Sequence, residues 1–214
     1  MELAKEKIAE IHARGKTPIV CGGTGLYIEL LLTGKQLGES SADEKLRAEL
    51  LAFANEHGNE ALHARLAEAD PASAQAIHPN NVKRVVRALE ICLTTGTTKT
   101  EADIQSRQGE NPYAPTIIRL TAGDRGALYA RIDKRVRLMF EMGLEQEVRA
   151  LCEKGLRDTP TASQAIGYKE FYPYFDGLMT IAQVEEDICR NTRRYAKRQE
   201  TWFGRMHCDE IVLI

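Results

Sequence analysis

Apolar and polar residues alternate with a helical period in the first fourteen positions of the chain. Ala4, Ile8 and Ile11 fall on one face, which predicts an amphipathic helix. The β-branched run at 18–21 follows directly and predicts a buried strand. Apolar residues continue over 27–32 and predict a second helix packed on that strand. This order is expected of half a βαβ unit whose first strand is missing.

The middle of the chain has no strand pattern between residues 42 and 96 and is expected to be helical. Ser41 is the expected cap of its first helix, because a hydroxyl accepts a hydrogen bond from a free N–H of the first turn. The remaining predictions are helices at 61–69, 72–77, 125–154, 163–174 and 181–203, and strands at 116–121 and 210–214.

These elements indicate an α/β fold in which a helical insertion interrupts the core. The insertion is expected at 41–113, and the core at 1–40 and 114–214. The patterns give this core only three strands. Parallel strands need neighbours and cover on both faces, so we expect the sheet to keep an open edge.

Composition adds limits rather than detail. With 214 residues, 43% hydrophobic and 28% charged, the chain is long enough for one large or two small domains with a buried core. It has no long apolar run, so we expect no membrane segment and a cytoplasmic location. Its five cysteines are widely spaced and form no C-x-x-C pair, which indicates neither a disulfide framework nor a zinc site.

A glycine cluster marks the junction between the strand predicted at 18–21 and the helix after it. In Gly22-Gly23-Thr24-Gly25 the small residues let an anion approach the backbone, and the free N–H groups of the helix start attract negative charge. The pattern therefore indicates a phosphate site. A helix start that Thr24 merely caps explains the same residues.

Basic residues are concentrated in a few segments, although the net charge of the chain is only −2. The segment 190–205 holds six basic residues and one acidic residue. On a helix, Arg190, Arg194, Lys197 and Arg198 share one face. Such a stripe suits a phosphate backbone, and a solvated helix face is the alternative.

Three further segments carry candidate anion ligands. One is the basic helix predicted over 81–90, with a buried valine side. Another holds Arg131 and Arg135 one turn apart, either to share an anion or to pair with nearby carboxylates. The third is the polar segment 161–169, which suits contact with RNA or an ordinary capped turn.

Together these segments resemble the tRNA dimethylallyltransferase (isopentenyl-diphosphate:tRNA transferase) family. The resemblance follows the chain in order through the motifs GGTGLY, HPNNVKRVVRALE, RIDKRVxxM, QAIGYKE and RRYAKRQETWF. It implies a P-loop NTPase-like parallel sheet, here partial with its first strands missing, and a helical insertion that contacts the tRNA anticodon stem-loop.

The resemblance also implies a reaction. A dimethylallyl group passes from dimethylallyl diphosphate to N6 of adenosine 37 in tRNA, after the adenine has left its stacked position. Mg²⁺ is the implied cofactor, as in nucleotide-binding proteins with a P-loop. We expect a monomer that does not contact a membrane.

Roles for individual residues follow from matching positions in the family. Thr24 and Arg135 are the catalytic candidates, and Gly23 joins them in binding the diphosphate, whose charge Arg135 neutralises as it leaves. The candidates for tRNA contact are Arg47, Lys83, Arg84, Arg87, Gln164, Ile166, Gly167, Tyr168, Lys169, Lys197 and Arg198.

Two motifs of the family do not occur in the chain. One is G-x-x-x-x-G-K-[ST], which cradles the diphosphate and places a hydroxyl on Mg²⁺, and the other is an Asp-Ser segment whose aspartate is the general base. We therefore expect little or no transferase activity from this chain alone. The alternatives are a non-catalytic RNA-binding remnant and a nucleotide kinase of the P-loop class, which would need a Walker lysine.

Overall fold

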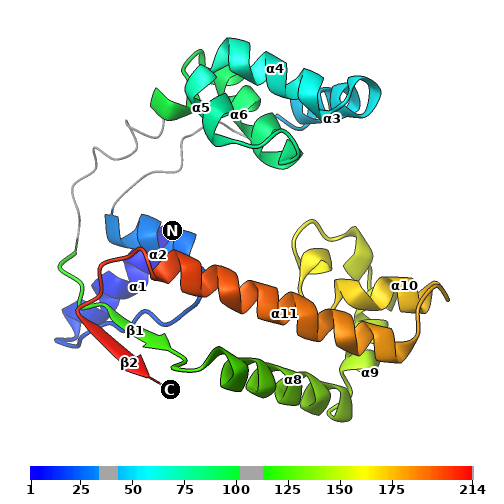
Figure 1. The fold of residues 1–214 in the computed structure, drawn as a ribbon. Coiled ribbons are helices and arrows are strands. Elements are labelled where there is room, and N and C mark those ends of the chain that lie inside the picture. The colour runs from blue at the N-terminus through cyan, green and yellow to red at the C-terminus, as the bar shows by residue number, and fades with distance from the viewer. Residues whose placement is uncertain (34–42, 102–112, 214) are drawn as a thin grey trace. The chain divides into compact units, whose positions relative to one another are not determined.

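The computed structural model describes residues 1–33, 43–101 and 113–213 (Figure 1). They form a mostly helical α/β protein with a parallel sheet of two strands. The elements, with η for a 3-10 turn, are α1 (Glu2–Ala13), α2 (Gly25–Thr33), α3 (Glu44–His57), α4 (Asn59–Ala69), α5 (Pro71–Ala76), α6 (Val82–Thr95), β1 (Ile118–Thr121), α8 (Arg125–Glu141), α9 (Leu144–Glu153), η1 (Leu156–Asp158), η2 (Ala162–Gln164), η3 (Lys169–Phe171), α10 (Tyr172–Phe175), α11 (Ile181–Phe203) and β2 (Glu210–Leu213).

The chain divides into two compact units. The first contains Met1–Gly22 and Leu26–Pro115, and the second contains Gly23–Gly25 and Thr116–Ile214. Their boundary at Pro115 lies close to residue 113, the predicted end of the insertion. That residues 1–40 belong with the C-terminal core stays a prediction. Among the described helices, none is both long enough and apolar enough to cross a membrane.

Capping residues decide where two helices of the first unit begin. The Asp43 carboxylate caps α3 and accepts a hydrogen bond from the backbone N–H of Leu46 at 2.9 Å. The predicted cap, Ser41, lies outside the described residues, and Asp43 takes the role because it directly precedes the first helical residue. Asp70 caps α5, where Pro71 occupies the first position at which no N–H is needed.

The helices α3 to α6 share one apolar core. α4 contacts the other three, and its Leu62 and Leu66 have no exposed surface, like Val85 of α6. Burying such a side chain completely contributes about 1.5–3 kcal/mol. The core thus fixes α6, whose remaining face carries basic residues.

The sheet of the second unit pairs β1 and β2 in parallel (Figure 1). Ile118 pairs with Glu210 and Thr121 with Leu213, so both strands end at the same edge. Both lie inside the predicted strand segments. The chain continues from this edge into α8, which begins four residues after β1 ends.

The third predicted strand, at 18–21, is wrong for the described structure. These residues form no regular element, and Ile19 is 88% exposed. A β-branched run favours extended backbone, but a strand also needs a hydrogen-bonded neighbour, and no described segment supplies one here.

Two predicted helices are interrupted, each at a glycine. The segment 125–154 is two helices, α8 and α9, separated at Gly143, where φ is +95°. The segment 163–174 is a series of short turns, η2, η3 and α10, around Gly167, where φ is also +95°. A positive φ lies outside the right-handed helical region, so an α-helix does not continue through these positions.

The helix α11 confirms the prediction at 181–203 and organises the second unit (Figure 1). Thr180 and Gln183 form a capping box at its start. Its first half packs Val184 and Ile188 into the apolar core around Phe171. These contacts make α11 the common support of the turns before it and of α8 beside it.

Replacing Phe171 by alanine is expected to destabilise the second unit by about 3–5 kcal/mol, because the ring is fully buried. Trp202, the single tryptophan, lies in this unit and reports its unfolding in urea by fluorescence. Leu178→Ala is the matched control, since Leu178 is 81% exposed and should change stability by less than about 0.5 kcal/mol. Equal midpoints and slopes for the two variants would contradict this account of the core.

Candidate functional site

The glycine turn Gly23–Gly25 rests on the C-terminal half of α11. The side-chain amide of Gln199 donates a hydrogen bond to the Gly23 carbonyl oxygen at 3.0 Å. Gly25 is buried against the indole of Trp202, and a Cβ built on Gly25 would lie only 2.2 Å from Trp202 Cδ1. Only glycine allows the backbone to approach the indole this closely.

Thr24 lies exposed between these two anchored glycines. Among the hydrogen bonds of the described residues, none involves the Thr24 hydroxyl. The hydroxyl therefore does not cap the helix that follows. The turn holds the backbone around Thr24 in place while its side chain stays accessible. This is the arrangement that a residue in contact with a ligand requires.

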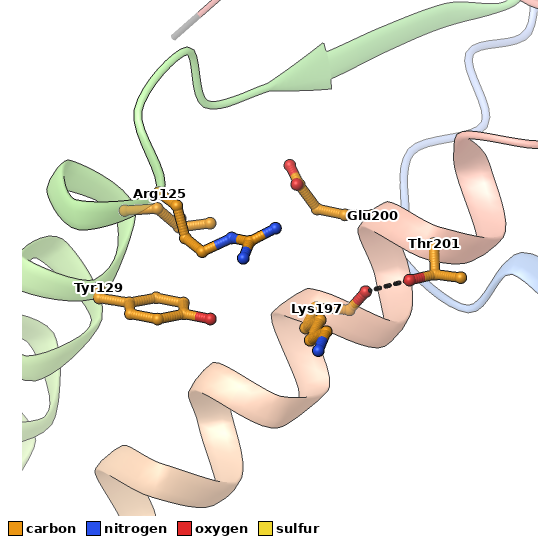
Figure 2. Close-up of a pocket in the computed structure, with 6 residues that line it drawn as sticks. Arg125, Tyr129, Lys197, Glu200 and Thr201 are labelled. Atoms are coloured by element: carbon orange, nitrogen blue, oxygen red, sulfur yellow. Dashed lines mark hydrogen bonds between the residues drawn. The ribbon is translucent and has the colours of Figure 1, made fainter.

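A pocket of about 240 Å³ lies between α8 and the same half of α11 (Figure 2). Figure 2 shows the Arg125 guanidinium extending from the first turn of α8 toward α11, with the Tyr129 ring below it. The pocket is lined by Arg125, Leu128, Tyr129, Lys197, Glu200 and Thr201.

The polar groups of the pocket are partly satisfied within the protein. The Thr121 hydroxyl donates to Glu200 Oε1 at 2.9 Å, and the Thr201 hydroxyl donates to the Lys197 carbonyl oxygen at 2.9 Å. Within the described ranges, no carboxylate lies in ion-pair contact with the side chains of Arg125 or Lys197. Two cations therefore face this pocket, and its one carboxylate is held by Thr121.

The position of the pocket in the fold favours ligand binding. Thr121 is the last residue of β1, and Arg125 is the first residue of α8. Ligands of parallel α/β proteins bind beyond the carboxyl ends of the strands, where the following helices begin. Asp124 caps α8 by accepting from the N–H groups of Gly126 and Ala127, and these bonds lower the pKa of its carboxyl.

Arg135 does not line this pocket. It is exposed and lies ten residues beyond Arg125 on α8, which is about 15 Å along the helix axis. Its predicted role at the diphosphate stays a prediction. Arg125 was missed by the sequence analysis, and the available signal was its place as the first helical residue after a predicted strand.

The predicted basic stripe of α11 divides into residues with different surroundings. Lys197 lines the pocket, and Arg198 is exposed with its guanidinium 5.6 Å from the Tyr195 ring centroid. Arg190 instead pairs with Asp187 of its own helix. Arg193, outside the predicted stripe, binds both Asp133 oxygens at 2.7 Å and holds α11 against α8.

The segment 164–169 is mainly a packed turn. The N–H of Gly167 donates to the buried Glu170 carboxylate at 2.9 Å, and the Asn191 amide donates to the same carboxylate at 2.7 Å. The Tyr168 hydroxyl donates to Glu147, while the ring packs with Ile166 against the core of the unit. Gln164 is exposed and Lys169 is partly exposed, so these two are the residues of the segment most accessible to a partner.

In the first unit, the candidates for tRNA contact are of two kinds. Lys83 and Arg84 are exposed on α6. Arg47 and Arg87 both bind the carboxylate of Glu90, a residue that the sequence analysis did not single out. Glu90 meets Arg47 only because α3 packs on α6, and the sequence around Glu90 gives no sign of this contact.

The chain belongs to the IPP transferase family, whose model matches residues 1–206. It is 48% identical over 202 residues to the tRNA dimethylallyltransferase of Halalkalibacterium halodurans and 47% identical over 201 residues to that of Bacillus subtilis. These alignments cover 94% of this chain but only 64% and 63% of the relatives. The predicted family resemblance is confirmed, and the alternative of a nucleotide kinase gains no support from these matches.

Solved structures agree with this assignment. The full-length tRNA isopentenylpyrophosphate transferase from Bacillus halodurans matches with a TM-score of 0.63 and 44% identity, over 100% of this chain and 64% of that one. A eukaryotic dimethylallyltransferase acting on tRNA matches with a TM-score of 0.71 and 30% identity, over 94% and 50%. The chain spans under two thirds of both.

Gly25→Ala is expected to displace the Trp202 indole, because the new methyl group would overlap it. We expect a loss of about 1–3 kcal/mol in stability, as for an overpacked core, and a changed tryptophan emission spectrum. Gly22→Ala is the control, since nothing lies within 4 Å of a Cβ at that position. The double variant Gly25→Ala with Trp202→Leu should regain part of the loss in a thermal melt. Identical behaviour of the two single variants would show that the turn does not rest on α11.

Proposed function

We propose that this chain takes part in transferring a dimethylallyl group from dimethylallyl diphosphate to N6 of adenosine 37 in the tRNA anticodon stem-loop. The observation that carries the proposal is a pocket at the carboxyl end of β1, in a chain of the IPP transferase family, that is lined by Arg125 and Lys197. Neither side chain forms an ion pair within the described residues. The glycine turn is anchored on the same half of α11, so Thr24 is held near this end of the unit.

In the proposed reaction, N6 of the adenine forms a bond to C1 of the dimethylallyl group while the bond from C1 to the diphosphate oxygen breaks. The electron pair of that bond leaves with the diphosphate, and N6 loses a proton. Negative charge grows on the leaving oxygen, so a fixed guanidinium and ammonium stabilise the transition state more than the bound substrate. We propose that Arg125 and Lys197 bind the diphosphate oxygens, and that Thr24 and Gly23 contact the same group.

A P-loop core and Mg²⁺ belong to the proposal on the strength of the family resemblance. In residues 1–33, 43–101 and 113–213, no three His, Cys, Asp or Glu side chains are grouped so that they would hold a metal ion. These residues therefore offer no all-protein cage for Mg²⁺, and we assign no step to the ion. A monomer in the cytoplasm, where a partner tRNA is available, completes the proposal.

RNA binding without turnover is the second candidate function. It is favoured by the absence of the full G-x-x-x-x-G-K-[ST] motif from these 214 residues, since Gly15-Lys16-Thr17 has Glu10 where the first glycine of the motif would stand. It is also supported by exposed cations on α6 and α11, namely Lys83, Arg84, Arg194 and Arg198. Such side chains bind phosphates without regard to base sequence, and the affinity they give falls steeply with salt.

Mass spectrometry of an anticodon stem-loop, incubated with the full chain, dimethylallyl diphosphate and Mg²⁺, distinguishes the two candidates. The transferase adds the mass of one dimethylallyl group, and an RNA with guanosine at position 37 gains none. Salt-dependent binding with no mass change supports the second candidate. If the stem-loop shows no binding and no mass change, both candidate functions are contradicted.

Lys197→Ala and Arg125→Ala are each expected to weaken diphosphate binding, measured by calorimetry with inorganic diphosphate. Where transfer is measurable, each should lower kcat/KM by about 100-fold, as when one fixed donor to a developing anion is removed. For diphosphate binding, Arg198→Ala is the matched control on α11, because Arg198 lies against Tyr195 and does not line the pocket. Arg135→Ala tests the predicted role of Arg135 at the diphosphate. If this variant loses more diphosphate affinity than Arg125→Ala, the diphosphate binds away from this pocket.

A further inference from the structure

Glu90 is a fully buried carboxylate of the helical unit, and both of its oxygens have partners. Oε1 accepts a hydrogen bond from the backbone N–H of Asp43 at 2.9 Å and lies in ion-pair contact with Arg47 Nε at 2.9 Å. Oε2 accepts from Arg47 Nη2 at 3.0 Å and from Arg87 Nη1 at 2.6 Å. One side chain of α6 therefore fixes the first residues of α3 and two arginines.

The two arginines are held but not buried. Each keeps 38% of its side chain exposed, whereas the Glu90 side chain has 0% exposure. Arg47 uses Nε and Nη2 on the carboxylate, and Arg87 uses Nη1, so each guanidinium keeps further N–H donors. Both side chains are therefore partly open to solvent or to a ligand.

The charges of this group balance. Arg47 and Arg87 lie on the carboxylate of Glu90, and Asp43, whose N–H binds Glu90, carries a second carboxylate that caps α3. Lys83 adds a positive charge to this surface, because it is exposed and lies one helical turn before Arg87 on α6. Buried ion pairs often contribute little to stability, so stability alone does not account for this arrangement.

Hydrogen bonds keep the buried Glu90 in its charged form. Burial alone would raise the pKa of this carboxyl, but the hydrogen bonds from Arg47, Arg87 and the Asp43 N–H outweigh it and lower the pKa below its ordinary value. The carboxylate therefore stays ionised at neutral pH and keeps both guanidinium groups in a defined direction.

We propose that Glu90 is a positioning residue that presents Arg47 and Arg87 as a rigid pair to two phosphate groups of an RNA backbone. A free arginine loses much of its rotamer freedom when it binds a phosphate. Arg47 and Arg87 have already lost that freedom in the folded chain, so binding is favoured by preorganisation. This inference rests on the proposed RNA partner, and goes beyond it by assigning a role to a residue that RNA does not touch.

Electrostatics and positioning make opposite predictions for Glu90→Gln. Removing a negative charge near an RNA surface should tighten binding if charge alone matters. Loss of the carboxylate that aligns two arginines should weaken it. We expect Glu90→Gln to weaken binding of a fluorescent stem-loop to the full chain by about tenfold in an anisotropy titration, comparable with the loss of one or two phosphate contacts.

Glu49→Gln is the matched control, because Glu49 is an exposed glutamate on α3 and its substitution removes the same charge from the same unit. It should leave binding unchanged or slightly tighter. Glu90→Asp is a second variant in case Glu90→Gln does not fold, because it keeps the buried carboxylate. Its shorter side chain is expected to keep one arginine and lose the other. Circular dichroism melts of every variant show whether the helices remain folded.

Arg47→Ala combined with Arg87→Ala completes the cycle. This variant should bind weakly and lower the slope of log affinity against log salt by about one to two. Adding Glu90→Gln to it should have no further effect, because Glu90 acts through these arginines. If the arginine variant binds weakly while Glu90→Gln and Glu90→Asp bind normally, the positioning role of Glu90 is wrong, although the two arginines still contact RNA. If the arginine variant also binds normally, RNA does not contact this surface, and the diphosphate assays of Arg125 and Lys197 still test the proposed function separately.

Discussion

The second unit depends on the packing of α11. Its first half buries Val184 and Ile188 in the apolar core, and Arg193 in its middle holds Asp133 of α8 through two contacts of 2.7 Å. Its last turns then contact the glycine turn and β1 through Gln199, Trp202 and Glu200. Because one continuous helix makes all of these contacts, the burial of its first half fixes the position of the pocket residues on its second half. The packing energy that fixes the pocket residues thus comes from side chains outside the pocket.

The two units use charged groups in different ways. In the second unit, Arg125 and Lys197 line a pocket and form no ion pair within the described residues, which suits a small anion whose charge rises during a reaction. In the first unit, Arg47 and Arg87 share the buried carboxylate of Glu90, which suits an extended polyanion that is bound and released. Membership of the IPP transferase family gives both arrangements a place in one proposed reaction, with a diphosphate at one and RNA at the other. The family relation covers 94% of this chain and 64% of a relative, so both assignments concern the part of the reaction that these residues carry.

The exposed apolar residues of the sheet show what two strands alone leave uncovered. Ile118 and Leu120 lie on one face of β1 and are 55% and 61% exposed, and Leu213 of β2 is 70% exposed. The apolar, β-branched residues that predicted these strands are typical of a parallel sheet covered on both faces. The same reasoning made 18–21 look like a strand. There the local pattern was present but a hydrogen-bonded neighbour was not, and the backbone took no regular form.

Local signals in the sequence were enough to predict several elements. The sequence placed α11 at 181–203 and the two strands of the sheet, because capping and periodicity act over a few residues. It also identified the family, since its motifs occur in order along the chain, and it singled out the glycine turn and Lys197. Folding was needed to show that Arg125, rather than Arg135, lines the pocket, and that Glu90 holds two arginines from different helices. The physical reason is that ion pairing and burial depend on which residues, distant in sequence, are brought together by packing, and a local pattern carries no record of that partner.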